Sequence, residues 1–161
     1  MLNKEAEKAE SYKQFIVFVL DDQDYGINVL DSREIITAEN LTILPDSPDF
    51  IKGIINLREE IIPIIDLTRR FNLENTLNEE ESKVIIISVN NTLIGLAVEE
   101  VKEILRVDTE NISDPPEMTQ NIKKNYIKGI ARLEERLLIL LDIDEIFSRE
   151  EIEKIEEMGN N

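Results

Sequence analysis

The feature that constrains the fold of this chain most is an internal repeat. The segment Gly53–Asp66 reads GIINLREEIIPIID, and 76 residues later Gly129–Asp142 reads GIARLEERLLILLD. When both copies are extended by three residues on the N-terminal side, seven of seventeen aligned positions are identical. A chain of 161 residues is long enough for one domain or two small packed lobes. The repeat therefore predicts two pseudo-equivalent lobes with one shared architecture.

A second pair of segments extends the repeat toward the N-terminus. Gly26–Ile36 and Gly95–Leu105 are 69 residues apart and share four of eleven residues. The two offsets differ because the linker Val107–Asn125, which contains two prolines, is longer than its counterpart in the first half. A duplicated lobe tolerates an insertion of this kind when it falls in a loop between strands.

Both halves are predicted to consist of β-strands. Each begins with a continuous apolar run, Gln14–Leu20 in the first half and Lys83–Val89 in the second, followed by a polar turn and an apolar return. Each repeat copy then adds a hairpin of two apolar runs around a polar corner. A lobe of about five strands closes best as a small barrel, because closure removes exposed strand edges. We expect a mainly β fold with two pseudo-repeated five-stranded barrels.

The two ends of the chain differ from the repeat. Residues 1–13 are mostly charged, which predicts a flexible N-terminal lead. The sequence Ser148-Arg-Glu-Glu151 is a capping box followed by apolar residues at helical spacing, which predicts a short C-terminal helix and a tail. The expected divisions are a folded domain at 14–148, with lobe one at about 14–82 and lobe two at about 83–147, and the helix and tail at 148–161.

The charge balance excludes several classes of partner. The net charge is −17, with 35 acidic and 18 basic residues, so the chain would repel nucleic acid phosphates and anionic lipid. No apolar run approaches the roughly 20 residues that span a bilayer, and the charged N-terminus does not resemble a signal peptide. We expect a cytoplasmic protein that binds no nucleic acid and does not insert directly into a membrane.

The chain contains neither histidine nor cysteine. It therefore lacks the usual metal ligands, the usual proton shuttle and the thiolate nucleophile. No glycine-rich phosphate loop is present either. These observations argue against most enzyme classes, and we expect no catalytic residues, no metal site and no cofactor.

One enzymatic alternative stays open at this stage. Asp66 and Asp142 occupy the same position in the two repeat copies. Two carboxylates brought together across a pseudo-twofold axis can share a proton and activate water, as in an aspartic hydrolase. The other interpretation is that each aspartate ends a strand and caps the turn that follows it.

Four of the five glycines form two repeat-related pairs, Gly26 with Gly95 and Gly53 with Gly129. Each glycine is expected to mark a β-bulge, a positive φ angle or a close crossing of strands.

Arg58 occupies the corner of the first hairpin, where the second copy has Glu134. The repeat geometry therefore does not require an arginine at this position. Arg58 is either a surface residue paired with Glu59 or Glu60, or a contact with a partner, for which the rigid guanidinium is well suited.

The ordered motifs resemble a known family. The segments FIVFVL, YGIN, REII, FIKGIINLR and IIPIIDL are followed by IGLAVEEVKEIL and YIKGIARLEERLLILLDI. Together they cover about Gln14 to Phe147 and are similar to the chemotaxis coupling protein family, CheW. The family usually has glycine where this chain has Glu59. The turn at this corner must therefore avoid a left-handed residue or carry about 1 kcal/mol of strain.

This resemblance implies two interlaced SH3-like barrels and a non-enzymatic adaptor. Such an adaptor couples the cytoplasmic tip of a methyl-accepting chemoreceptor to the regulatory domain of the chemotaxis histidine kinase, and it is recruited to membrane-bound receptor arrays. The alternatives are a CheW-like scaffold of another kinase-linked signalling or motility pathway and, more remotely, a two-lobed aspartic hydrolase.

The resemblance also implies roles for individual positions. It implies receptor contacts at Ser32, Glu34 and Ile104, kinase or other partner contacts at Arg58 and Gly53, and structural roles for Gly26, Gly95 and Gly129.

Overall fold

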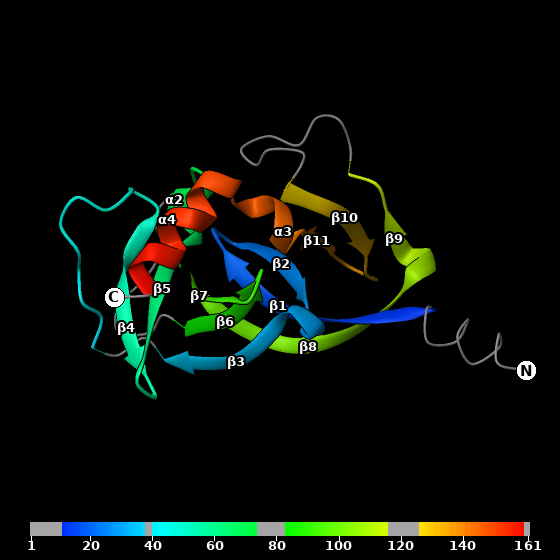
Figure 1. Cartoon of the computed structure of the whole chain (residues 1–161). Helices are drawn as coiled ribbons and strands as arrows, with labels where there is room; N and C mark the ends of the chain where they lie inside the picture. The colour runs from blue at the N-terminus through cyan, green and yellow to red at the C-terminus, as the bar shows by residue number, and fades with distance from the viewer. Residues whose placement is uncertain (1–10, 38–39, 74–82, 116–125, 160–161) are drawn as a thin grey trace, which may run out of the picture.

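The computed structural model describes residues 11–37, 40–73, 83–115 and 126–159. Of the expected flexible lead, residues 1–10 lie outside these ranges. The described chain is mainly β, with two sheets and a short C-terminal helix, which confirms the predicted fold class (Figure 1). Within these ranges, none of the helices is long and apolar enough to cross a membrane. The elements are β1 (Tyr12–Leu20), β2 (Gln23–Asn28), η1 (Val29–Asp31), β3 (Ser32–Thr37), β4 (Ile51–Leu57), β5 (Glu60–Asp66), α2 (Leu67–Arg70), β6 (Lys83–Val89), β7 (Thr92–Val98), β8 (Glu100–Asp108), η2 (Thr109–Asn111), β9 (Ile112–Ser113), β10 (Ile127–Arg132), β11 (Leu137–Leu141), α3 (Ile143–Ile146) and α4 (Arg149–Gly159).

The two sheets are interlaced. One sheet, which we name barrel one, has the strand order β3-β6-β7-β5-β4, and the other, barrel two, has the order β8-β1-β2-β11-β10-β9. The first hairpin of each half of the chain, β1–β2 or β6–β7, therefore lies in the barrel built mostly by the other half. The lobe boundary at residues 82 and 83 divides the sequence repeat, whereas each barrel contains strands from both halves.

The connections show that the sheets roll up. In barrel two, β8 and β9 occupy opposite edges of the sheet, yet only the three residues of η2 join them. Because so short a connection cannot cross a flat sheet of this width, the two edges must approach each other. In barrel one, Thr42 lies beyond the end of β3 and pairs with Ile54 on the outer edge of β4. The expected linker at 107–125 thus contains structure in its first part, because η2 and β9 lie within it.

Two of the glycines lie where the exchanged hairpins meet their hosts. Gly95 pairs with Ile64, and Gly26 pairs with Leu140, in the parallel ladders that join β7 to β5 and β2 to β11. A Cβ atom on Gly95 would lie 2.5 Å from Ile64 Cδ1 and 2.7 Å from Val84 Cγ1. No described glycine has a positive φ angle. At Gly95, the packed side chains of Ile64 and Val84 therefore leave no room for a Cβ atom, which explains the glycine.

The other two glycines lie at β-bulges beside the segments that close the barrels. The ladders shift register just before Gly53 in β4 and just before Gly129 in β10. A Cβ atom on Gly53 would clash with the carbonyl oxygen of Thr42, and one on Gly129 would lie 3.0 Å from the carbonyl oxygen of Ser113. Both glycines therefore let the closing segment pass close to the sheet.

The core has three parts, which explains the continuous apolar runs in the sequence. Alternate residues of β1 point in opposite directions, so that Ile16 and Phe18 join a large central cluster while Phe15 and Val17 join a small cluster of barrel two. Barrel one has its own small cluster, which includes Ile62 and Ile64 of β5. A strand with both faces buried needs apolar residues at every position.

The C-terminal helix α4 begins at the predicted capping box. The Ser148 Oγ accepts a hydrogen bond from the Glu151 amide at 3.1 Å, and the Ser148 amide donates to Glu151 Oε1 at 2.8 Å. The helix packs on β5 and buries Ile152 and Ile155 in the central cluster. It therefore belongs to the core, although it lies outside the repeat.

Candidate functional site

The corner between β4 and β5 is a tight turn with unusual backbone angles. Leu57 pairs with Glu60, which leaves Arg58 and Glu59 as the two residues of the turn. Their φ angles are 50° and 71°. Positive φ at both positions is typical of the type I′ hairpin turn, which favours asparagine and glycine. The turn does not avoid the left-handed region, so Glu59 carries the strain that the sequence left as one of two possibilities.

Arg58 forms a bidentate ion pair with Glu34 on β3. Its two terminal nitrogens donate to the two carboxylate oxygens of Glu34, each at 2.9 Å. The partner is neither Glu59 nor Glu60, which were the expected surface partners. The Arg58 side chain is 75% exposed, so the pair adds at most about 1 kcal/mol to stability. Its main effect is to connect a predicted kinase contact to a predicted receptor contact.

The three residues predicted to contact a receptor lie on two different strands. Ser32 begins β3, and its hydroxyl donates to the carbonyl of Val29 at 2.7 Å, so this half-buried group has a local role. Ile104 lies on β8 of barrel two and is 59% exposed. Its repeat equivalent, Ile35 on β3, is 40% exposed. In Figure 1, β3 and β8 both run along the lower border of the molecule.

Gly53, the other predicted partner contact, is buried beneath the closing segment at Leu41 and Thr42. A buried residue without a side chain cannot touch a partner directly in this conformation. Any effect of Gly53 on binding would be indirect, through the path of β4, which leads to the Arg58 corner.

The sequence analysis missed the most exposed apolar side chain of the described residues. Leu30 on η1 is 89% exposed, and the Asn28 side chain fixes this short turn by accepting from the Leu30 amide at 2.9 Å. Leu30 borders an open hollow of about 620 Å³. An apolar residue directly after an Asn cap was the available signal, but the same pattern also occurs in buried turns. The hollow is lined by Tyr12, Lys13, Gln14, Asn28, Val29, Leu30 and Thr109.

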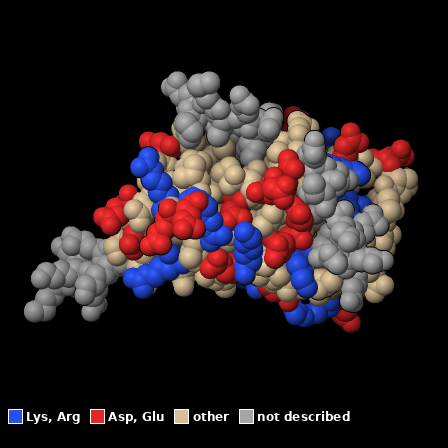
Figure 2. Space-filling view, turned by 180° about the vertical axis from the view of Figure 1, so that it is seen from behind, with Lys and Arg blue, Asp and Glu red and all other residues tan. Residues whose placement is uncertain are grey.

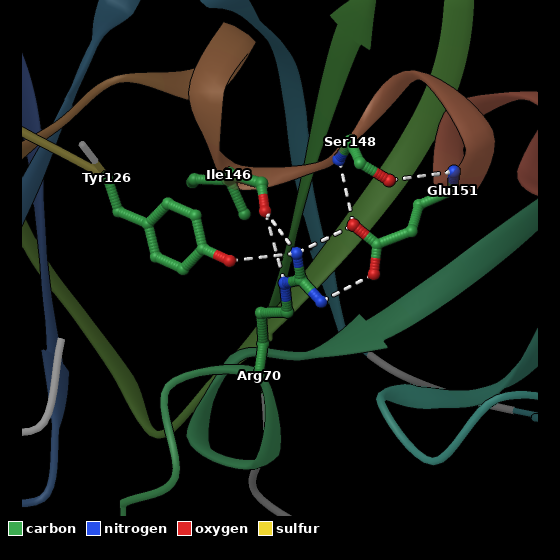
Figure 3. A network of polar contacts seen from close by, with 5 residues as sticks. All are labelled: Arg70, Tyr126, Ile146, Ser148 and Glu151. Atoms are coloured by element: carbon green, nitrogen blue, oxygen red, sulfur yellow. Dashed lines mark hydrogen bonds and ion pairs between the residues drawn. The ribbon is translucent and has the colours of Figure 1, made fainter. Parts of the chain in front are cut away.

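Arg70 connects helices from both halves of the chain (Figure 3). Its guanidinium donates to the carbonyl of Ile146 at 2.7 Å, to the Tyr126 hydroxyl at 2.9 Å and to both Glu151 oxygens at 2.6 and 2.7 Å. Only 14% of the side chain is exposed, and the ring of Phe50 lies 4.9 Å from the guanidinium carbon. This network holds α2 against α3 and α4.

The same contacts shift the pKa of Glu151. Burial by itself would raise this pKa, but the hydrogen bond from the Ser148 amide and the hydrogen bonds and charge of Arg70 outweigh it, so the pKa is lowered. Glu151 therefore stays ionised to lower pH than a free glutamate does.

Asp66 and Asp142 each cap the helix that follows them. Asp66 Oδ1 accepts from the Thr68 amide at 3.0 Å, and Asp142 Oδ1 accepts from the Asp144 amide at 3.2 Å. No hydrogen bond between the two aspartates occurs among the described residues. The capping interpretation accounts for both residues, and no group of three or more metal-ligating side chains is found in the described ranges.

Comparisons with known proteins agree with this geometry. The CheW-like domain family matches residues 14–151. The chemotaxis protein CheW of Klebsiella aerogenes is 34% identical over 149 residues, which cover 92% of this chain and 90% of that protein. The chemotaxis protein CheW of Thermotoga maritima is 33% identical over 141 residues, covering 86% and 91% of the two chains.

The fold has a solved counterpart as well. The crystal structure of the scaffolding protein TtCheW from Thermoanaerobacter tengcongensis matches with a TM-score of 0.79 and 34% identity, covering 84% of this chain and 88% of that one. A family match over most of the chain and a shared fold at this identity lead to one conclusion. This chain belongs to the CheW-like domain family.

Proposed function

We propose that this chain is a non-enzymatic adaptor that couples the cytoplasmic tip of a chemoreceptor to the regulatory domain of the chemotaxis histidine kinase. The observation that carries the proposal is the pair of exposed, repeat-equivalent isoleucines, Ile35 and Ile104, on strands of different barrels. Each isoleucine leaves apolar side-chain surface in water, which an apolar residue of a protein partner would cover favourably.

The receptor is proposed to bind along β3 and β8. Ile35, Ile104 and the exposed Leu30 supply apolar contacts for an amphipathic helix, which is the shape of partner that apolar grooves accept. The carboxylate of Glu34 borders these contacts and supplies a polar edge. Ser32 contributes by fixing the start of β3 through its hydrogen bond to Val29.

The kinase is proposed to bind at the Arg58 corner. Arg58 is exposed and its guanidinium is oriented by Glu34, so a partner meets a side chain that has already lost part of its freedom. The two proposed contact regions are therefore connected by one ion pair. A partner that binds at one region would therefore alter the position of the Glu34 side chain and, through it, the other region.

The surface charge is consistent with protein partners. In the rear view of Figure 2, acidic side chains are spread over the surface with basic ones between them, and the net charge is −17. Such a surface attracts partners with basic patches and repels anionic lipid. We therefore propose that the chain acts in the cytoplasm and reaches receptor arrays by binding a receptor instead of the bilayer.

A binding experiment with matched variants tests this function. The full chain would be titrated by calorimetry with a receptor signalling fragment and, separately, with a kinase regulatory domain. The expected result is binding to both, with Ile104→Ser weakening receptor binding alone. Ile43→Ser is the matched control, because Ile43 is 76% exposed but lies in the loop before β4. Absence of binding to either fragment would contradict the proposal.

A CheW-like scaffold of another kinase-linked or motility pathway is the second possibility. It would retain the kinase-type contact at Arg58 and fail to bind a chemoreceptor fragment. The same titrations therefore separate the two functions.

A further inference from the structure

Barrel two contains a charge cluster that is the spatial counterpart of the Arg58–Glu34 pair. Glu103 on β8 is the repeat equivalent of Glu34. It also forms an ion pair with an arginine from a neighbouring hairpin corner. That arginine is Arg136, which lies two residues beyond Glu134, the aligned counterpart of Arg58. An alignment of the repeat therefore hides the equivalence, and only the structure reveals it.

The cluster is more extensive in barrel two than in barrel one. Arg136 Nη2 donates to Glu103 Oε2 at 3.0 Å, and Arg136 Nη1 donates to Asp24 Oδ2 at 2.7 Å. The other oxygen of Asp24 lies 3.0 Å from Lys102 Nζ. Asp24 is only 8% exposed on β2. A buried carboxylate held by two cations is a firm anchor, because separating the charges would leave Asp24 unpaired inside the protein.

The charge cluster lies at the irregular part of β8. The ladder between β8 and β1 shifts register where Val17 pairs with Glu103 and Phe18 pairs with Val101, which leaves Lys102 as the extra residue of a β-bulge. Lys102 and Glu103 are the residues that the cluster holds. The exposed Ile104 follows immediately, so its direction depends on how this bulge is fixed.

We propose that Arg136 and Asp24 are positioning residues that fix the β8 bulge and thereby orient Ile104 for receptor contact. This inference rests on the proposed function. It concerns the partly exposed network around the buried Asp24 in barrel two, which is separate from the Arg58–Glu34 pair.

Variants of Arg136 test the inference in the full chain. Arg136→Ala and Asp24→Asn should each weaken binding of a receptor signalling fragment by about tenfold, since residues that act through a neighbour change coupling by this order. Arg136→Lys should recover part of the affinity, because one ammonium can reach Asp24 or Glu103 but cannot hold both in the same geometry. Arg132→Ala is the matched control, because Arg132 is an exposed arginine of β10 with no ion pair among the described residues.

Amide hydrogen exchange gives the readout that a general loss of stability would not imitate. In Arg136→Ala, exchange should accelerate at Ile104 and Leu105 and stay unchanged at the repeat-equivalent amides of Ile35 and Ile36. Unchanged receptor affinity in Arg136→Ala, or equal acceleration in β3 and β8, would overturn the inference.

The exchange experiment also separates this inference from the proposed function. If the wild-type chain binds no receptor fragment, the proposed function fails, and the receptor part of the inference fails with it. Faster exchange confined to β8 would then still show that Arg136 holds the strand, and unchanged exchange would reject that as well.

Discussion

The two hairpin corners have the same register and different chemistry. In barrel one, Arg58 and Glu59 both have positive φ, whereas no residue of the Glu134-Glu135 turn in barrel two does. The arginine of barrel one lies at the tip of its turn and is 75% exposed, while Arg136 of barrel two follows its turn and is 36% exposed. A duplicated fold has thus kept an arginine-to-glutamate contact while moving the arginine along the chain. Arg58 is largely exposed to solvent, whereas Arg136 is partly covered and also pairs with the buried Asp24.

The largest expected difference between the barrels concerns their bulge glycines. Gly53→Ala should lower the free energy of unfolding by about 2–3 kcal/mol, because the new methyl group meets the Thr42 carbonyl and the backbone must shift. Gly129→Ala should cost about 1 kcal/mol, since its closest contacts lie at 3.0 Å. Urea denaturation of both variants measures the difference. Equal losses would mean that the two closing segments yield equally.

The more buried of the two arginines should contribute more to the free energy of unfolding. Arg136→Ala should lower the free energy of unfolding by about 1–2 kcal/mol, because it leaves the buried Asp24 with one cation instead of two. Arg58→Ala should cost less than about 0.5 kcal/mol, as expected for an exposed pair. Thermal and urea unfolding give both values. A larger loss in Arg58→Ala than in Arg136→Ala would reverse the comparison.

Substituting glycine into the turn should raise stability in barrel one and lower it in barrel two. Glu59→Gly should stabilise the chain by about 1 kcal/mol, because glycine adopts a φ of 71° without strain. Glu135→Gly should destabilise it by about 0.5 kcal/mol, because its φ is already in the ordinary range and glycine adds entropy to the unfolded chain. Melting temperatures of the two variants, measured side by side, show whether the signs are opposite.

The smallest expected effect concerns acid. The pKa of Glu151 is lowered in the folded protein, so its contribution is fully present above the ordinary value of 4.5 and is lost as the pH falls through the lowered folded pKa. Glu151→Gln should therefore be less stable than the wild type at pH 7 and should lose less stability between pH 5 and pH 3. Unfolding curves at these pH values provide the check. Parallel curves for the two proteins would count against a role of Arg70 in holding α4.

Local patterns in the sequence predicted the local structure well. The strands, the Asp66 and Asp142 caps and the capping box of α4 follow from hydrophobic runs and hydrogen-bonding side chains only a few residues apart. The interlacing of the barrels was available only through the family resemblance, because apolar runs do not specify which strands pair.

The charge networks could not be predicted from the sequence for a related reason. Arg58 and Glu34 are 24 residues apart, and Arg136 and Asp24 are 112 residues apart. The sequence contains many acidic residues that could serve either arginine, and only the folded backbone selects among them. The exposure of Leu30 is similarly a property of the assembled surface.

The exchange of hairpins has a consequence for the chain when it is cut. A fragment ending at residue 82 would contain β1 and β2 without the strands on which they pack, and the remaining piece would lack a host for β6 and β7. Neither piece should be ordered in isolation. When the two pieces are mixed, they should reassemble into the intact fold with second-order kinetics, because each piece supplies the strands that the other lacks.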